Sequence, residues 1–389
     1  VCTVLGYDNP VSGTSAMDGM APGAKVSFCD IGNDAPDGYV HPPNDYSIMW
    51  QAVKDDGGRT QSNSWGSSYQ ETYTADEAMI DDWVYRNPNV LFTWSAGNSG
   101  TAVRTVGNQA AAKNAIAIGA SGTAASNFGA GTETTDAVAA YSSRGPSYDN
   151  RLKPDIIAPG CVMNSADGDT TNGYANMQGT SMAAPNAVGG VLLLHDYFKQ
   201  GFYPTGAAVA GNSFDPSHSL IKAMLVNSAK RTATLTNPYR NYYDTGTTGS
   251  WPSVDQGWGI MKLNDCVYIS GGARQLQVYD GDNGLTTGSY IDYKYRVNAV
   301  NQDLRVAVTW NDYPATPGAG IALVNNLDLT ITSPSGAVFK GNVFANNNPP
   351  NSITGGTYDA RNNMEHFRLP ASHASLVLGT WNIRVSGAS

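Results

Sequence analysis

The chain has 389 residues, with 32 acidic against 23 basic side chains and a formal net charge of −9 at pH 7. Nucleic-acid binding depends on clusters of Lys and Arg, and the sequence has no block of either, so nucleic acid is not expected as a partner. No run of about eighteen apolar residues occurs, so no membrane-spanning segment is expected. The length is sufficient for a large core and two domains.

The first 260 residues alternate strand-like and helix-like segments. Continuous apolar strands that alternate with helices indicate an α/β fold with a parallel sheet covered on both faces, and ligands of such sheets lie beyond the carboxyl ends of the strands. Residues 64–67 and 95–98 follow strands at that edge. The predicted strands are residues 25–31, 60–65, 90–94, 115–120 and 156–158, and the predicted helices are residues 44–56 and 75–86.

A Ser-Gly-Gly sequence at residues 270–272 marks the predicted boundary between two domains, residues 1–270 and 271–389. Beyond it, short segments with alternating apolar residues and turn residues between them predict an antiparallel, jelly-roll-like β-sandwich. These strands are expected at residues 290–297, 304–310, 327–332, 337–339, 364–369, 375–378 and 380–385.

The four cysteines are even in number and include no Cys-x-x-Cys pair, so zinc spacing is absent. Two disulfides and buried free thiols are both compatible with the sequence. If all four are bridged, the expected pairing is Cys2–Cys29 with Cys161–Cys266, one of three pairings. Disulfides would imply an oxidising compartment. Together with a charged fraction of only 14% and a start without Met, they favour a processed, secreted protein.

Ser181 lies between small residues at the start of a helix-like run. A helix N-terminus favours negative charge, which suits a serine that acts as a nucleophile beside an oxyanion. The alternative is that Ser181 is an ordinary helix N-cap, because Ser is a preferred cap residue.

The surrounding motif, GTSMAAP at residues 179–185, resembles the nucleophile motif of the subtilisin-like serine proteases (subtilases). Five other segments are similar to subtilase segments and occur in the family's order. They are GMAPGAK at 19–25, NSWG at 63–66, WSAGN at 94–98, SSRGP at 142–146 and KPDIIAPG at 153–160. The resemblance implies a secreted serine endopeptidase that cleaves proteins or peptides through an acyl-enzyme.

The resemblance also implies residue roles. Ser181 would attack the scissile carbonyl, and the side-chain amide of Asn98, with the Ser181 main-chain N–H, would hold the oxyanion. The implied substrate-binding residues are Ser64, Trp65 and Gly66, which would pair with the substrate as an added strand, and Ala96 and Gly97 in the side-chain pocket.

The chain departs from the family pattern because the motifs that carry the family's aspartate and histidine are absent. None of the five histidines, His41, His195, His218, His366 and His373, lies in the His-Gly-Thr-His-Val motif. Asp30 mimics the aspartate pattern but follows the GMAPGAK segment, so it is interpreted as structural or substrate-adjacent. The base and its carboxylate would therefore come from residues outside this chain.

Three explanations compete: a separate N-terminal fragment that stays non-covalently bound, an N-terminal segment outside the recorded sequence, and an inactive truncated paralogue. Loss of an inner strand from a parallel sheet leaves backbone groups unpaired, so this chain is not expected to fold alone in native form. The alternative function is a catalytically inactive pseudoprotease or peptide-binding subunit. A lectin-like sandwich is a further alternative.

Residues 309–315, 323–329 and 359–365 resemble segments of the C-terminal β-sandwich in an alkaline subset of bacterial subtilases. Carboxylate oxygens are hard donors suited to Ca²⁺, so structural calcium is expected there. The alternative is turn chemistry at strand ends, and for Asp328 a buried polar anchor. The candidate ligands are Asp312, Asp328, Asp359 and Glu365.

Overall fold

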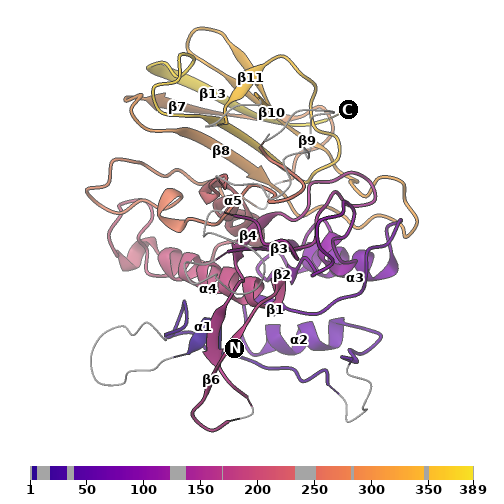
Figure 1. The fold of residues 1–389 in the computed structure, drawn as a ribbon. Helices are drawn as coiled ribbons and strands as arrows, with labels where there is room; N and C mark the ends of the chain where they lie inside the picture. Colours follow the sequence, from indigo (N-terminus) through magenta and orange to yellow (C-terminus); the bar gives the residue numbers. More distant parts are fainter. Residues whose placement is uncertain are drawn as a thin grey trace.

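The computed structural model describes residues 2–6, 18–32, 39–122, 137–168, 170–232, 251–281, 284–345 and 350–388. An α/β portion lies below a β-sandwich (Figure 1). No helix in these described ranges combines the length and the hydropathy needed to cross a membrane.

The α/β portion is built on a four-stranded sheet in the order β1-β2-β3-β4, and every neighbouring pair is parallel. The predicted parallel sheet is therefore confirmed. Because the strands are parallel, the segments that follow β1 and β2 emerge at the same edge. The strands are β1 (Thr60–Asn63), β2 (Leu91–Ser95), β3 (Ile116–Ser121) and β4 (Ile156–Pro159).

Helices cover both faces of this sheet, because successive strand side chains point to opposite sides. Phe92 and Trp94 of β2 pack in one core with α2 (Ser47–Asp55) and α3 (Ala75–Arg86). Leu91 of the same strand packs in a second core with α4 (Thr180–Lys199) and α5 (His218–Ser228). The sheet thus places the start of α4 at its carboxyl edge.

Several shorter elements complete this portion. A hairpin of β5 (Met163–Ala166) and β6 (Tyr174–Met177) precedes α4 and projects at the bottom of the view (Figure 1). Its two four-residue strands mix apolar and polar residues and are largely exposed, and the sequence pattern did not predict them. The others are α1 (Cys2–Leu5), η1 (Gln109–Ala111), η2 (Ala210–Asn212) and η3 (Leu263–Asp265).

The strand predicted at residues 25–31 is wrong, since this segment is an irregular and largely exposed chain. A buried parallel strand needs a hydrogen-bonding neighbour. No strand in the described part of the chain pairs with this segment, and β1, an edge strand of the sheet, pairs there only with β2. The alternation of apolar residues is therefore not sufficient for a strand to form.

The β-sandwich is antiparallel, as predicted. A five-stranded sheet in the order β11-β10-β9-β13-β7 faces the pair β12-β8, and Leu329, Phe367 and Trp381 are buried between them. The strand predicted at residues 375–378 is wrong; Leu376 N donates to His373 O in a turn. The strands are β7 (Tyr290–Val297), β8 (Leu304–Thr309), β9 (Leu327–Thr332), β10 (Val338–Phe344), β11 (Ser352–Thr354), β12 (Met364–Leu369) and β13 (Gly379–Gly387).

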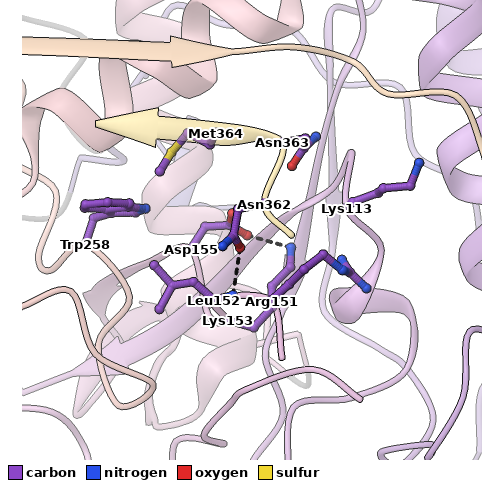
Figure 2. Close-up of a pocket in the computed structure, with 9 residues that line it drawn as sticks. All are labelled: Lys113, Arg151, Leu152, Lys153, Asp155, Trp258, Asn362, Asn363 and Met364. Carbon is purple, nitrogen blue, oxygen red and sulfur yellow. Dashed lines mark hydrogen bonds and ion pairs between the residues drawn. The ribbon is translucent and has the colours of Figure 1, made fainter. Parts of the chain in front are cut away.

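Buried polar contacts join the sandwich to the amino ends of β3 and β4. Lys113 Nζ lies 2.7 Å from Asp312 Oδ2, and both side chains are fully buried. Leu152 N donates to Asn362 Oδ1 at 2.8 Å beside a small polar cavity (Figure 2). This cavity, about 10 Å³, has room for one water. The sandwich therefore packs at the end of the sheet opposite the start of α4. The predicted boundary near residue 270 stays a prediction.

The predicted disulfides are wrong for the cysteines whose side chains the structure describes. Cys29, Cys161 and Cys266 are all free thiols. Cys161 Sγ lies 3.3 Å from the Tyr141 hydroxyl, and Cys266 Sγ donates to Leu263 O at 3.2 Å. Pairing depends on tertiary geometry, which the even number of cysteines does not contain. The side chain of Cys2 lies outside the described residues.

Candidate active site

Ser181 lies in the first turn of α4, directly opposite the segment that follows β1. Its Oγ donates to Ser64 O at 3.3 Å, and Ser64 Oγ donates to Ser181 O at 2.9 Å. Gly179, just before the helix, has φ of 152°, a conformation that L side chains rarely adopt. The glycine therefore allows the sharp entry into the helix that exposes this serine.

Asn98 lies beside the same turn. Its Oδ1 accepts hydrogen bonds from Thr180 N at 2.9 Å and from Thr180 Oγ1 at 3.0 Å. Thr180 Oγ1 in turn accepts a hydrogen bond from Gly97 N at 3.1 Å. These bonds hold the amide group in one orientation. Its nitrogen is the atom that can donate a hydrogen bond to another group. A Cβ on Gly179 would lie 3.4 Å from that nitrogen.

The segment predicted to pair with substrate, residues 64–66, lies next to Ser181. Ser64 and Gly66 are exposed, and Trp65 is partly buried edge-on against Tyr46 and Trp94. Trp65 O accepts a hydrogen bond from Trp94 Nε1 at 2.6 Å, which fixes the backbone. The main-chain N–H groups of Ser64 and Gly66 donate no hydrogen bond within the described residues, so they are available to a peptide strand.

Small residues connect this segment to the one that follows β2. Gly107 N donates to Ala96 O at 2.9 Å, and Asn108 N donates to Ser67 O at 3.1 Å. A Cβ on Gly107 would lie 2.9 Å from Ser67 O, and a Cβ on Gly97, at φ 105°, would lie 2.8 Å from Ser143 Oγ. Larger residues are therefore excluded at Gly97 and Gly107. Sequence reasoning missed both Gly107 and Thr180, and neither carries a local signal of its own.

None of the five histidines, all in described ranges, contacts Ser181. Burial lowers the pKa of His195 to about 4 and that of His218 to about 3, and it also lowers that of His366. His218 Nδ1 lies 3.4 Å from Val90 O. Asp30 is exposed, and its Oδ1 accepts a hydrogen bond from Gly32 N at 2.8 Å. Within the described residues, Ser181 therefore has no base.

The four acidic residues predicted to bind calcium do not form one cluster. Asp312 is the buried partner of Lys113, so it anchors the sandwich. Asp359 accepts hydrogen bonds from Arg361 N and from the Asn342 and Asn362 side chains. Burial and the charge of Asp359 raise the pKa of both Asp328 and Glu365. The described ranges contain no group of three or more acidic, His or Cys side chains arranged to hold a metal. Calcium binding stays a prediction.

The model of the subtilase family matches residues 1–259, which include Ser181, Asn98 and residues 64–66. The chain belongs to the subtilase family. The predicted family is thereby confirmed, and with the parallel sheet and the antiparallel sandwich so is the fold class. The absence of an N-terminal part of the domain stays a prediction.

Curated relatives of this subtilase include larger proteins. This chain is 28% identical over 438 residues to the serine protease/ABC transporter B family protein tagD of Dictyostelium discoideum, and the match covers 82% of this chain and 24% of that protein. This chain is also 27% identical over 297 residues to pyrolysin of Pyrococcus furiosus, and the match covers 67% of this chain and 18% of that protein. The chain spans about a quarter or less of the length of these relatives.

Among solved structures, the self-cleaved protease domain of PatA matches with a TM-score of 0.47 at 19% identity, covering 68% of this chain and 79% of that one. The S41 psychrophilic protease matches with a TM-score of 0.44 at 23% identity, covering 63% of this chain and 71% of that one.

Proposed function

We propose that this subtilase is a serine endopeptidase whose nucleophile is Ser181 and whose histidine and aspartate come from residues outside this chain. One observation carries the proposal: Thr180 holds the Asn98 amide oxygen by two hydrogen bonds, so the amide nitrogen is left beside the Ser181 turn. A donor fixed in place before the reaction stabilises an oxyanion without reorganisation.

The reaction would begin with substrate added as a strand along Ser64, Trp65 and Gly66, with its side chain next to Ala96 and Gly97. The external histidine would take the proton of Ser181 Oγ as the oxygen attacks the scissile carbonyl. Asn98 Nδ2 and Ser181 N would donate to the resulting oxyanion. Collapse of this intermediate would release the amine and leave an acyl-enzyme on Ser181, which water then hydrolyses.

The edge of the sheet supports an external source for the base. Within the described residues β1 is an edge strand, because it pairs with β2 on one side alone. An additional N-terminal strand could pair with its other side. A non-covalently bound N-terminal fragment is our preferred source. Intact-mass analysis of the native preparation tests whether a second polypeptide travels with this chain.

A fluorophosphonate probe on the native preparation tests the proposed function, because it reacts with a serine only when a base activates it. We expect one label, on Ser181, and none in the Ser181→Ala variant. The competing candidate is a peptide-binding pseudoprotease, favoured by the lack of any histidine contact to Ser181. Correctly folded native material that binds peptides but takes up no label would establish that candidate instead.

Two finer parts of the proposal are secretion and structural calcium. Secretion is supported by the charged fraction of 14%, and comparison of the culture medium with the cell lysate tests it. Calcium is supported by Asp328 and Glu365, whose raised pKa values reflect burial and the nearby charge of Asp359, a repulsion that a cation would relieve. EGTA should then lower the melting temperature, and added Ca²⁺ should restore it.

A further inference from the structure

A cavity of about 350 Å³ opens where η3 and the chain after it meet the ends of β7 and β8. Its volume falls in the range of about 300–1,000 Å³ that is typical of small-molecule sites, which often lie between structural units. Part of the lining is apolar, from Val267, Leu276, Val297, Leu304 and Leu376. Nothing in the proposed peptidase mechanism uses this cavity.

Three arginines and two aspartates also line the cavity. Arg274 Nη1 lies 2.7 Å from Asp265 Oδ1, and Arg305 Nη2 lies 2.9 Å from Asp303 Oδ2. Arg296 differs from these two. Its Nε donates to Asn298 Oδ1 at 3.2 Å, and no carboxylate within the described residues pairs with it.

A fourth guanidinium increases the local positive charge. Arg368 Nη2 lies 2.9 Å from Asp303 Oδ2, so Arg305 and Arg368 share one carboxylate. Burial, and next the nearby charge of Arg305, lower the pKa of Arg368, while Asp303 and Asp265 act in the opposite direction. Arg274, Arg305 and Arg368 thus share the two carboxylates of Asp265 and Asp303, and Arg296 adds a further positive charge at the cavity, in a chain whose formal net charge is −9.

We propose that this cavity binds a small ligand with a carboxylate and an apolar body, of the kind that the C-terminal residue of a peptide presents. A guanidinium group recognises a carboxylate through two parallel hydrogen bonds, and Arg296 has donors to spare. The apolar lining would contact the body of the ligand. The volume equals that of about twelve water molecules at about 30 Å³ each, which is enough for an N-acylated amino acid.

The cavity is remote from Ser181. Tyr197, near the end of α4, donates to Tyr268 O at 2.9 Å, next to the cavity residues Cys266 and Val267. Ser181 lies about 24 Å away along that helix at about 1.5 Å per residue. A ligand in the cavity would therefore not compete with peptide in the groove, and the inference does not depend on the proposed function.

Isothermal titration calorimetry on the full chain tests this proposal with N-acetyl-L-leucine, N-acetyl-L-leucinamide and inorganic phosphate. We expect saturable binding of N-acetyl-L-leucine and at least tenfold weaker binding of the uncharged amide. Arg296→Gln should weaken binding at least tenfold. The matched control is Arg384→Gln, on the neighbouring strand and outside the cavity, and it should leave binding unchanged.

A second variant, Ala299→Trp, fills the cavity from its exposed rim and should abolish binding while the melting temperature stays near that of the wild type. Equal affinity for the acid and the amide would overturn the proposal, as would binding that neither variant alters, or no saturable binding of N-acetyl-L-leucine at millimolar concentration. Phosphate binding without N-acetyl-L-leucine binding would identify an inorganic oxyanion site and would also contradict it.

Discussion

Asn98 is held by Thr180 through one of its two functional atoms, the amide oxygen. Its Oδ1 is bound to Thr180, and the amide nitrogen lies beside the Ser181 turn. Asn98→Ala should lower kcat of the native preparation by about 10²–10³-fold, the size of effect found when a subtilase loses one oxyanion donor. KM should change little, because the lost bond forms in the transition state. Steady-state kinetics on a peptide substrate measures both constants.

The matched control is Asn44→Ala, at an exposed position before α2, which should leave both constants unchanged. Asn98→Ala also removes the acceptor for Thr180 N, so a stability loss of about 1 kcal/mol is expected in the same variant. A rise in KM with kcat unchanged would show that Asn98 binds substrate rather than the oxyanion.

Glu77 makes the stability of the protein depend on pH. Burial, the largest effect, raises the pKa of its carboxyl to about 7, from 4.5 in the unfolded chain. The folded state therefore binds the proton more tightly, and stability falls as pH rises from about 4.5 to 7. Relative to Glu77→Gln, the wild type should lose about 2 kcal/mol between pH 5.5 and 8. Urea unfolding at both pH values measures this difference.

Gln is the matched replacement because it can still accept the hydrogen bond from Thr74 N that closes the first turn of α3. If the difference between the two proteins does not change with pH, Glu77 is ionised across this range and the burial argument fails.

At the scale of single residues, the sequence was informative where a motif was long. The seven residues around Ser181 and the five around Asn98 placed both residues through a family resemblance, and the structure brings them together. The cysteines had no such context, and three of them are free thiols. The role of Thr180 depends on a contact across 82 residues, which no local pattern contains.

Among the elements, those with strong local signals were predicted well. The helix predicted at residues 75–86 is α3, because Thr74 and Glu77 form a capping box at its start. Residues 25–31 have a comparable apolar pattern but form no strand, because strand formation depends on a neighbour. The hairpin β5–β6 was missed because its strands are short and largely exposed, so they have no pattern of alternating burial, and they form by pairing with each other.

The contact between β3 and the sandwich includes one buried ion pair. Lys113 and Asp312 are fully buried, and Asp312 also accepts hydrogen bonds from Val324 N and Asn325 N. Asp312→Ala should cost about 3–5 kcal/mol, because it leaves a buried ammonium group without its carboxylate. Urea unfolding of the full chain measures this loss.

The double variant Lys113→Met with Asp312→Leu is the comparison for Asp312→Ala. It should recover most of the lost stability because both charges of the pair are removed together. A loss below about 1 kcal/mol in the single variant would show that water reaches Lys113 in the native protein.

At the scale of the whole molecule, β1 is an edge strand of the parallel sheet within the described residues, and the sandwich covers the end of that sheet opposite the start of α4. If a bound N-terminal fragment supplies an additional strand, the β1 main-chain N–H groups that face away from β2 should exchange with solvent in the native preparation about as slowly as the N–H groups of the inner strand β2. Hydrogen exchange with mass spectrometry measures both strands. Exchange at least tenfold faster in β1 would mean that no strand pairs with it in the native protein.

The free thiols differ in their access to reagents. Cys161 and Cys266 are buried, and burial raises the pKa of Cys266 to about 12, so this thiol is almost wholly protonated at neutral pH. Cys29 is exposed within the irregular segment of residues 18–32. A maleimide fluorophore added to the folded chain would therefore attach at Cys29 in preference to Cys161 or Cys266, and its emission would report on whatever docks there without any engineered substitution.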